Sequence, residues 1–295
     1  MGRYMLHIWV PIVVLLLVGV AIFLTSRDAT FQLLESKGLI AQQQKNLFIF
    51  ATLIMTGVSA VVFALLAIIA RQYSAARSVS NRYSPEWASS KALESLWWGI
   101  PIAIIIVLAA VTWQSSHALD PYKPIVSDKT PVNVQVIALQ WRWLFIYPDH
   151  SIASLNELVV PVDRPINFVI TSDAPMNSFW IPQLGGQVYA MSGMSTRLHL
   201  QADRVGVYRG TSANISGRGH ADMKFTTRAV SETEYTEWIS KTTRTNKTLT
   251  DQMYNEIRKP TIDRSSDRYV VSNAKLYDDV IFRYTQGHMS HGGAH

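Results

Sequence analysis

Residues 131–138 read PVNVQVIA, a run in which Val132, Val134 and Val136 alternate with the polar residues Asn133 and Gln135. Two later stretches alternate in the same way, with mostly apolar side chains at every second position: Ile166, Phe168 and Ile170 in one, and Thr196, Leu198 and Leu200 in the other. Side chains two positions apart share one face of a β-strand, so this pattern is typical of half-buried strands. Clusters of Pro, Gly, Asn and Asp separate these short strands, which predicts an antiparallel sandwich or barrel over residues 117–230.

The pattern changes to a helical one after this segment. Ser231 and Glu234 have the spacing of a capping box, in which the two side chains satisfy backbone N–H groups at a helix start, and Trp238 follows at helical spacing. We therefore expect a small helical appendage over residues 231–285. Residues 286–295 are mostly Gly, His and Met without periodicity, and we expect them to form a flexible tail.

Two long runs without charged residues precede the predicted β-structure. Residues 47–70 contain no charge over 24 positions, enough for a helix of about 36 Å against a bilayer core of about 30 Å. Residues 95–116 form the second run and have tryptophans near both ends, where indole rings favour the membrane interface. The sequence therefore predicts a transmembrane helical hairpin within residues 28–116.

A shorter apolar run lies within residues 1–27, behind Arg3. Its length fits either a signal peptide or a signal-anchor helix, and we favour the anchor because no small-x-small cleavage site follows. The loop between the two later runs carries four basic residues and the segment before them carries three. This small excess predicts that the loop lies in the cytoplasm. The C-terminal domain then lies outside the cytoplasm, whether the first segment is a signal peptide or an anchor helix.

Composition excludes several classes of function. Of the 295 residues, 48% are hydrophobic and only 16% charged, and the net charge of +6 comes from 27 basic and 21 acidic residues spread along the chain. Such a surplus is not the footprint of a nucleic-acid-binding protein. The chain has no cysteine, which excludes disulfides, thiolate metal sites and a cysteine nucleophile. We find no nucleophile–base pair, phosphate loop or carboxylate dyad, and so predict no catalytic residue.

Candidate site residues lie in two stretches, MNSFWIP at 176–182 and YRGTSANISGRGHADM at 208–223. Together with the preceding hairpin, they resemble subunit II of the haem–copper terminal oxidases. The resemblance implies an all-β, cupredoxin-like sandwich behind the membrane helices. In copper-bearing members of that family the sandwich holds a two-copper centre between two cysteines, completed by histidines, a methionine and a glutamate carbonyl.

The family's ligand positions fall on six residues of this chain: Asn177, Ser212, Asn214, Ser216, His220 and Met223. Only His220 and Met223 keep a ligand type. Both bridging thiolates are replaced by hydroxyls, which at neutral pH are neither anionic nor soft enough to hold a pair of coppers. We therefore predict a degenerate copper site, with no metal and no other cofactor bound by this chain.

Loss of the thiolates distinguishes quinol oxidases from cytochrome c oxidases within this family. The runs TWQSSHAL at 112–119 and YAMSGMSTRLHL at 189–200 also resemble subunit II of bacterial cytochrome bo-type ubiquinol oxidases. The resemblance implies a non-catalytic subunit of a proton-pumping oxidase in the aerobic respiratory chain. It further implies subunits I, III and IV as partners in the bacterial inner membrane, with haem, copper and ubiquinone in subunit I and the C-terminal domain in the periplasm.

Glu94 opens the second apolar run, in the sequence ESLWWGIP at 94–101. This pattern resembles the family motif whose glutamate lies at the cytoplasmic mouth of a proton channel of the catalytic subunit. Alternatively, Glu94 is only a helix-start charge favoured by the helix dipole. We predict the proton-channel role.

The segment QWRWLFIY at 140–147 resembles the aromatic stretch at which electrons enter cytochrome c oxidases. Because no copper follows it here, we expect these rings to serve as core packing. A copper-bearing subunit of a cytochrome c oxidase is rejected by the absence of cysteine. A stand-alone, membrane-tethered cupredoxin-like binding or sensor protein remains the alternative function.

Overall fold

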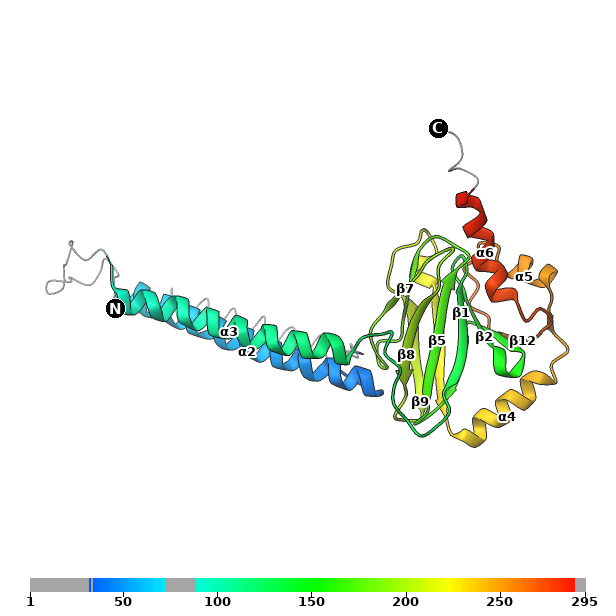
Figure 1. The fold of residues 1–295 in the computed structure, drawn as a ribbon, viewed down its shortest axis with the longest axis horizontal. Helices are drawn as coiled ribbons and strands as arrows, with labels where there is room; N and C mark the ends of the chain where they lie inside the picture. Colours follow the sequence, from blue (N-terminus) through cyan, green and yellow to red (C-terminus); the bar gives the residue numbers. More distant parts are fainter. Residues whose placement is uncertain (1–31, 33, 73–88, 290–295) are drawn as a thin grey trace, which may run out of the picture. The chain divides into compact units, whose positions relative to one another are not determined.

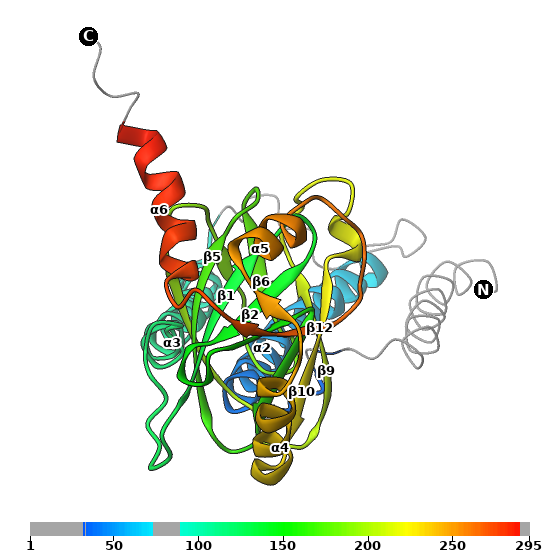
Figure 2. The same ribbon diagram turned by 90° about the vertical axis from the view of Figure 1, so that its right-hand side faces the viewer.

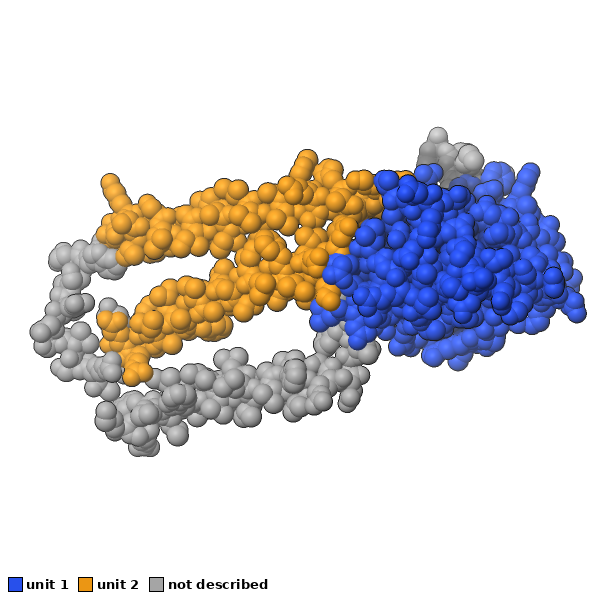
Figure 3. Space-filling model, turned by 90° about the horizontal axis from the view of Figure 1, so that it is seen from below, with its two compact units in different colours: residues 1–42, 125–295 blue, residues 43–124 orange. Residues whose placement is uncertain are grey.

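The computed structural model describes residues 32, 34–72 and 89–289. The chain divides into two units, one of residues 1–42 and 125–295 and one of residues 43–124 (Figure 3). The predicted signal or anchor segment at 1–27 lies outside the described residues, as do most of the loop between the two spans and the last six residues. We call residues 125–289 the β-domain.

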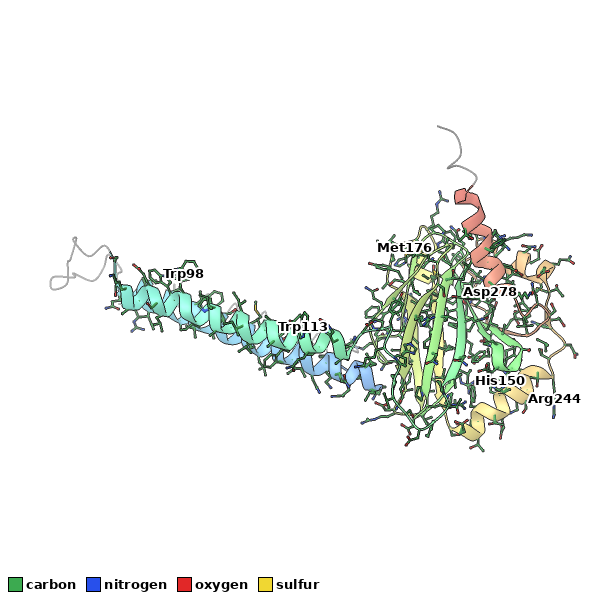
Figure 4. The ribbon with its side chains drawn as sticks, viewed as in Figure 1. Trp98, Trp113, His150, Met176, Arg244 and Asp278 are labelled. Carbon is green, nitrogen blue, oxygen red and sulfur yellow. The ribbon has the colours of Figure 1, made fainter. Side chains whose placement is uncertain are left out.

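Two long helices, α2 (Leu39–Gln72) and α3 (Lys91–Ala118), contain the two apolar runs. Each is longer than its run because polar residues continue the helix at both ends, and Ser90 caps α3 by accepting a hydrogen bond from the Leu93 N–H at 3.5 Å. No side chain is buried in the most apolar stretch of either helix. Trp98 and Trp113 project from α3 and are 66% and 71% exposed (Figure 4). Both helices therefore have the length and the apolar surface that a membrane span needs.

The β-domain is a sandwich of two sheets, which confirms the predicted all-β fold. The seven-stranded sheet has the order β11-β12-β3-β2-β1-β5-β8 and the five-stranded sheet the order β4-β10-β9-β6-β7. The first consists of β1 (Val132–Ala138), β2 (Trp143–Tyr147), β3 (Ile152–Leu155), β5 (Pro165–Ser172), β8 (Thr196–Gln201), β11 (Thr248–Leu249) and β12 (Asp267–Val271). The second consists of β4 (Glu157–Pro161), β6 (Asn177–Trp180), β7 (Val188–Ala190), β9 (Gly206–Ser212) and β10 (Lys224–Val230).

Aromatic rings fill the space between the two sheets. Phe179 stacks on Phe225 with ring centroids 5.2 Å apart, and Trp143 and Phe145 meet both rings at steeper angles. Such pairs add about 0.5–1.5 kcal/mol to the gain from apolar burial. This core holds together the ends of β6 and β9, from which the candidate site is built.

The expectation of a purely antiparallel sheet was wrong. Strand β1 runs parallel to β5, β4 parallel to β10, and β11 parallel to β12. Parallel neighbours need a crossover connection, and here the chain passes through the other strands before it returns. The alternation of single strands does not contain this information, because it reports burial and not strand direction.

The C-terminal segment adds three helices: α4 (Glu232–Thr243), α5 (Asp251–Ile257) and α6 (Leu276–Met289). The predicted capping box of α4 is confirmed, since Ser231 and Glu234 bond each other's backbone N–H groups. The segment also contributes β11 and β12 to the larger sheet, because residues 269–271 (YVV) favour a strand. Helix α6 continues to Met289, four residues into the segment 286–295 that we expected to form a flexible tail. The end of a helix depends on local hydrogen bonds, which the composition of the segment does not specify.

Helices α5 and α6 lie near one end of the larger sheet and α4 near the other (Figures 1 and 2). Helices α5 and α6 cover the face of that sheet that points away from the smaller one, whereas α4 packs Tyr235 and Trp238 into the core between the two sheets, with Trp238 against Tyr147 of β2. All five side chains of β2 are therefore buried, with Leu144 and Ile146 in a second apolar cluster alongside Tyr254, Ile257 and Val280. Two short 3-10 turns, Pro148–His150 and His220–Asp222, complete the domain.

Candidate functional site: a degenerate metal centre

The six residues carried over from the copper ligands come from two loops at one end of the sandwich. Asn177 is the first residue of β6 and Ser212 the last of β9, while the other four lie in the connection from β9 to β10. Backbone hydrogen bonds close this connection, since the Ser212 N–H donates to the Met223 carbonyl at 3.2 Å. We call these six residues the degenerate site: Asn177, Ser212, Asn214, Ser216, His220 and Met223.

Hydrogen bonds join three members of the degenerate site. The Ser212 hydroxyl accepts from the Ser178 N–H at 3.3 Å and lies 3.1 Å from both the Asn177 Oδ1 and the Asn214 carbonyl. The Asn214 amide donates to the Met176 carbonyl at 2.8 Å, which ties the second loop back to the first. Asn177 and Ser212 are 1% and 3% exposed, so the polar network that joins the two loops is buried.

The other three members lie deeper in the β9–β10 connection. Met223 is fully buried and belongs to the main apolar core, and its Sδ is 4.0 Å from the Ser216 hydroxyl. His220 begins the 3-10 turn, and its Nδ1 is buried without a hydrogen-bond partner among the described residues. The thioether therefore serves as core packing, while the imidazole nitrogen has no hydrogen bond to any of the described residues.

Trp141 covers this connection, a contact that the sequence analysis missed. Its indole Nε1 donates to the Ser216 carbonyl at 3.1 Å. A Cβ at Gly219 would clash with the Trp141 ring, so only glycine fits there. Trp141 itself has a φ of 78°, which is rare for a bulky residue and costs about 1–3 kcal/mol. The two glycines at 217 and 219 were the only available signal, because close approach of a ring needs a residue without a side chain.

The donor set does not fit a two-copper centre. It offers amide and hydroxyl oxygens, one imidazole and one buried thioether, whereas copper in such a centre needs bridging thiolates, and the chain has no cysteine. Within the described residues, no group of three or more His, Asp or Glu side chains is placed to hold another metal. We therefore derive no electron-transfer step through this site.

Two cations directly follow residues of this region in the chain, and the sequence analysis singled out neither. Arg142, in the loop between β1 and β2, is buried and donates to the Ile257 carbonyl; its pKa is lowered because burial disfavours its charge, an effect that Asp263 opposes. The pKa of Lys224 is also lowered, first by desolvation and then by repulsion from Arg209 and Arg264. Asp222 pairs with Arg264, so acids offset part of this positive charge.

The aromatic segment at 140–147 behaves mainly as core. Trp143, Phe145 and Tyr147 are fully buried, and the Tyr147 hydroxyl donates to the Val159 carbonyl at 2.9 Å. Burial raises the pKa of Tyr147 well above its usual value. Only Trp141 reaches the degenerate site, and it does so as a cover for the loop.

Glu94 lies in the first turn of α3 and is half-buried. Its N–H donates to the Ser90 carbonyl at 2.9 Å, so the residue sits where the helix dipole favours a negative charge. Glu94 belongs to the helical unit and the degenerate site to the β-domain. They are two separate candidate sites.

Comparison with known proteins identifies the class to which this architecture belongs. The family model described as "Cytochrome C oxidase subunit II, periplasmic domain" matches residues 150–230. The periplasmic domain of cytochrome oxidase subunit II of Bradyrhizobium japonicum aligns with 39% of this chain and 96% of its own length, at 24% identity and a TM-score of 0.37. The match to the family model, together with the two-sheet sandwich, makes the β-domain a cupredoxin-like domain of the oxidase subunit II type.

Relatives over nearly the whole chain define the branch of that class. Cytochrome bo(3) ubiquinol oxidase subunit 2 of Pseudomonas putida is 41% identical over 88% of this chain and 83% of its own length. Ubiquinol oxidase subunit 2 of Acetobacter aceti is 39% identical over 91% of this chain and 88% of its own length. The chain belongs to the quinol oxidase subunit II family of the haem–copper oxidases, as the sequence motifs predicted.

Proposed function

We propose that this chain is subunit II of a proton-pumping ubiquinol oxidase and carries no redox centre of its own. One observation carries the proposal: a chain with family relatives over most of its length has hydroxyl and amide side chains where a copper pair needs thiolates. Without copper, the described part of the β-domain offers no metal centre that could accept an electron from a protein donor. Electrons must then enter elsewhere in the complex, from quinol.

Haem, copper and ubiquinone accordingly belong to subunit I in this proposal, and this chain contributes assembly and support. Helices α2 and α3 support that role because their apolar windows bury no side chain within the described structure. Such surfaces can contact lipid on one side and the helices of a larger bundle on the other. Subunits III and IV complete the proposed complex.

The proposed location is the inner membrane of a bacterium, with the β-domain in the periplasm. Two apolar helices and a match to a family model of a periplasmic domain support it. The basic residues between the two spans support a cytoplasmic hairpin loop. The first 27 residues would add a third span or be removed as a signal.

Glu94 is proposed to lie at the mouth of a proton channel. A carboxylate at the start of a membrane span, half-buried and beside the apolar Trp97, is placed to collect protons from water and pass them to a partner subunit. Its first-turn position also satisfies the helix dipole, so the kinetic effect of removing it distinguishes the two roles.

Purification from native membranes in mild detergent tests the proposed function. The complex recovered through this chain should contain haem-bearing subunit I and should consume oxygen with ubiquinol as electron donor. Recovery of the chain without haem, in membranes that retain quinol oxidase activity, would favour the stand-alone binding or sensor protein instead. The family relationship supports the oxidase, since the relatives align over both the hairpin and the β-domain.

A further inference from the structure

A pocket of about 630 Å³ opens beside the degenerate site, where the end of α5 meets the loop between β5 and β6. Pro175, in the loop that leads to β6, forms part of its wall, and the Pro175 carbonyl accepts a hydrogen bond from the degenerate-site residue Asn177 at 2.7 Å. Its polar lining comes from Gln140, Ser192, Asn255, Arg258, Lys259 and Tyr284. We call it the α5 pocket; its volume lies in the usual range for small-molecule sites of about 300–1,000 Å³.

The one carboxylate that lines the α5 pocket has no free acceptor position. The Asp173 side chain is fully buried and takes four donors. Its Oδ1 accepts from Arg258 at 3.0 Å and from the Tyr284 hydroxyl at 2.6 Å. Its Oδ2 accepts from the Tyr254 hydroxyl at 2.6 Å and from Arg283 at 3.1 Å. The negative charge is thus neutralised within the domain and does not compete for ligands in the pocket.

The remaining lining is rich in unused donors. Arg258 has five N–H groups, and the described structure shows one of its side-chain nitrogens bonded to Asp173. The side-chain amides of Gln140 and Asn255 have no hydrogen-bond partner within the described residues. Lys259 pairs with Glu256 at 2.6 Å, but both side chains are about 60% exposed, and such a surface pair contributes little and exchanges readily.

We propose that the α5 pocket binds an oxyanion, a phosphate or carboxylate group, between Arg258 and Lys259. Two cations, unpaired amides and a saturated acid favour a negatively charged ligand over a neutral or cationic one. Both a soluble anionic metabolite and the headgroup of an anionic lipid carry this chemistry. The proposal concerns a site separate from the oxidase reaction and does not depend on it.

Calorimetric titration of the purified complex in detergent tests this site, with inorganic phosphate and glycerol 3-phosphate as soluble probes and chloride at matched ionic strength as the reference. Lys259→Gln should weaken phosphate binding about fivefold, because it removes the attraction between two unit charges roughly 4 Å apart in a water-like dielectric. Asn255→Asp should weaken it at least as much, by placing an unpaired carboxylate in the pocket. Neither residue contacts Asp173, and Lys275→Gln, an exposed lysine outside the lining, is the control and should change nothing.

A second arm identifies the source of the anion. The complex in nanodiscs of phosphatidylcholine, with and without phosphatidylglycerol, reports whether a headgroup occupies the pocket and blocks the soluble probes. Soluble binding that phosphatidylglycerol abolishes assigns the pocket to a headgroup, and binding that persists assigns it to a soluble anion; both support the site. The proposal is overturned if no probe binds above the chloride reference, or if Lys259→Gln and Asn255→Asp bind as tightly as the wild type.

Discussion

Replacing Asp173 should separate the C-terminal helices from the sandwich. Its carboxylate follows β5 directly and holds Tyr254 and Arg258 at the end of α5 and Arg283 and Tyr284 on α6. Asp173→Asn keeps the size of the side chain but loses the charge and half of the acceptor capacity. Two guanidinium groups and two hydroxyls then compete for one amide oxygen.

The cost can be estimated from burial. Removing one partner of a buried ion pair costs about 3–5 kcal/mol because the other charge is left uncompensated. Here the acid is fully buried, but the two arginine side chains are 31% and 38% exposed, and water screens them. We therefore expect Asp173→Asn to lower the free energy of unfolding by about 2–3 kcal/mol. Tyr254→Phe, which removes one hydroxyl, should cost about 1 kcal/mol.

Urea unfolding followed by tryptophan fluorescence, on the full chain in detergent, measures the cost. Trypsin cleavage at Arg283 measures the release of α6 directly, since that arginine is held only while the helix is docked. Asp128→Asn, an exposed acid in the segment before β1, is the matched control and should unfold and cleave like the wild type. Equal unfolding free energies for Asp173→Asn and Asp128→Asn, with unchanged cleavage, would refute the assignment of Asp173 as the tie between the helices and the sheet.

Three further predictions follow from the caps and the two candidate sites. Ser231→Ala should lower the free energy of unfolding in urea by about 1 kcal/mol. Hydrogen bonds to Ser231 lower the pKa of Glu234, so the stabilisation by the Glu234 carboxylate is present above about pH 4.5 and is lost as the pH falls further. The stabilities of wild type and Glu234→Gln should therefore converge on acidification, and a difference that stays constant with pH would contradict the cap. Glu94→Gln should slow quinol-dependent turnover per haem several-fold with assembly unchanged, whereas Glu94→Asp should retain most activity; equal turnover in all forms would remove Glu94 from the proton path. Restoring four ligands should rebuild a purple two-copper centre, detectable by absorption and metal analysis; the changes are Asn177→His, Ser212→Cys, Asn214→Glu and Ser216→Cys. A variant that folds but binds no copper would disprove the assigned correspondence of positions.

The strands and the first C-terminal helix could be predicted because their signals are local. The alternation around Val134 and Phe168 and the capping box at Ser231 each lie within a few residues of one another. Strand direction could not be predicted in this way, since the parallel pairing of β1 with β5 depends on where the intervening chain crosses. The second apolar cluster could not be predicted either, because Leu144 is buried together with Tyr254 and Val280, which lie more than 100 residues away along the chain.

The motifs predict which six residues stand at copper-ligand positions, and this correspondence stays a prediction; they did not predict the hydrogen bonds among those residues. In the structure the Ser212 hydroxyl and the Asn177 Oδ1, two of the predicted positions, lie within hydrogen-bond distance of each other, at 3.1 Å. The Asp173 cluster carried no sequence signal, because its four donors lie 81 or more residues away along the chain. Long-range polar contacts of this kind become visible only when the chain is folded.

The number of copper atoms per complex tests the central claim most directly. If this chain lacks a metal centre, the complex purified through it should contain only the single copper proposed for subunit I, measured by elemental analysis against haem content. Reduced cytochrome c should then fail to drive oxygen uptake while ubiquinol succeeds. Three coppers per complex, with two of them lost when this chain is removed, would contradict the account.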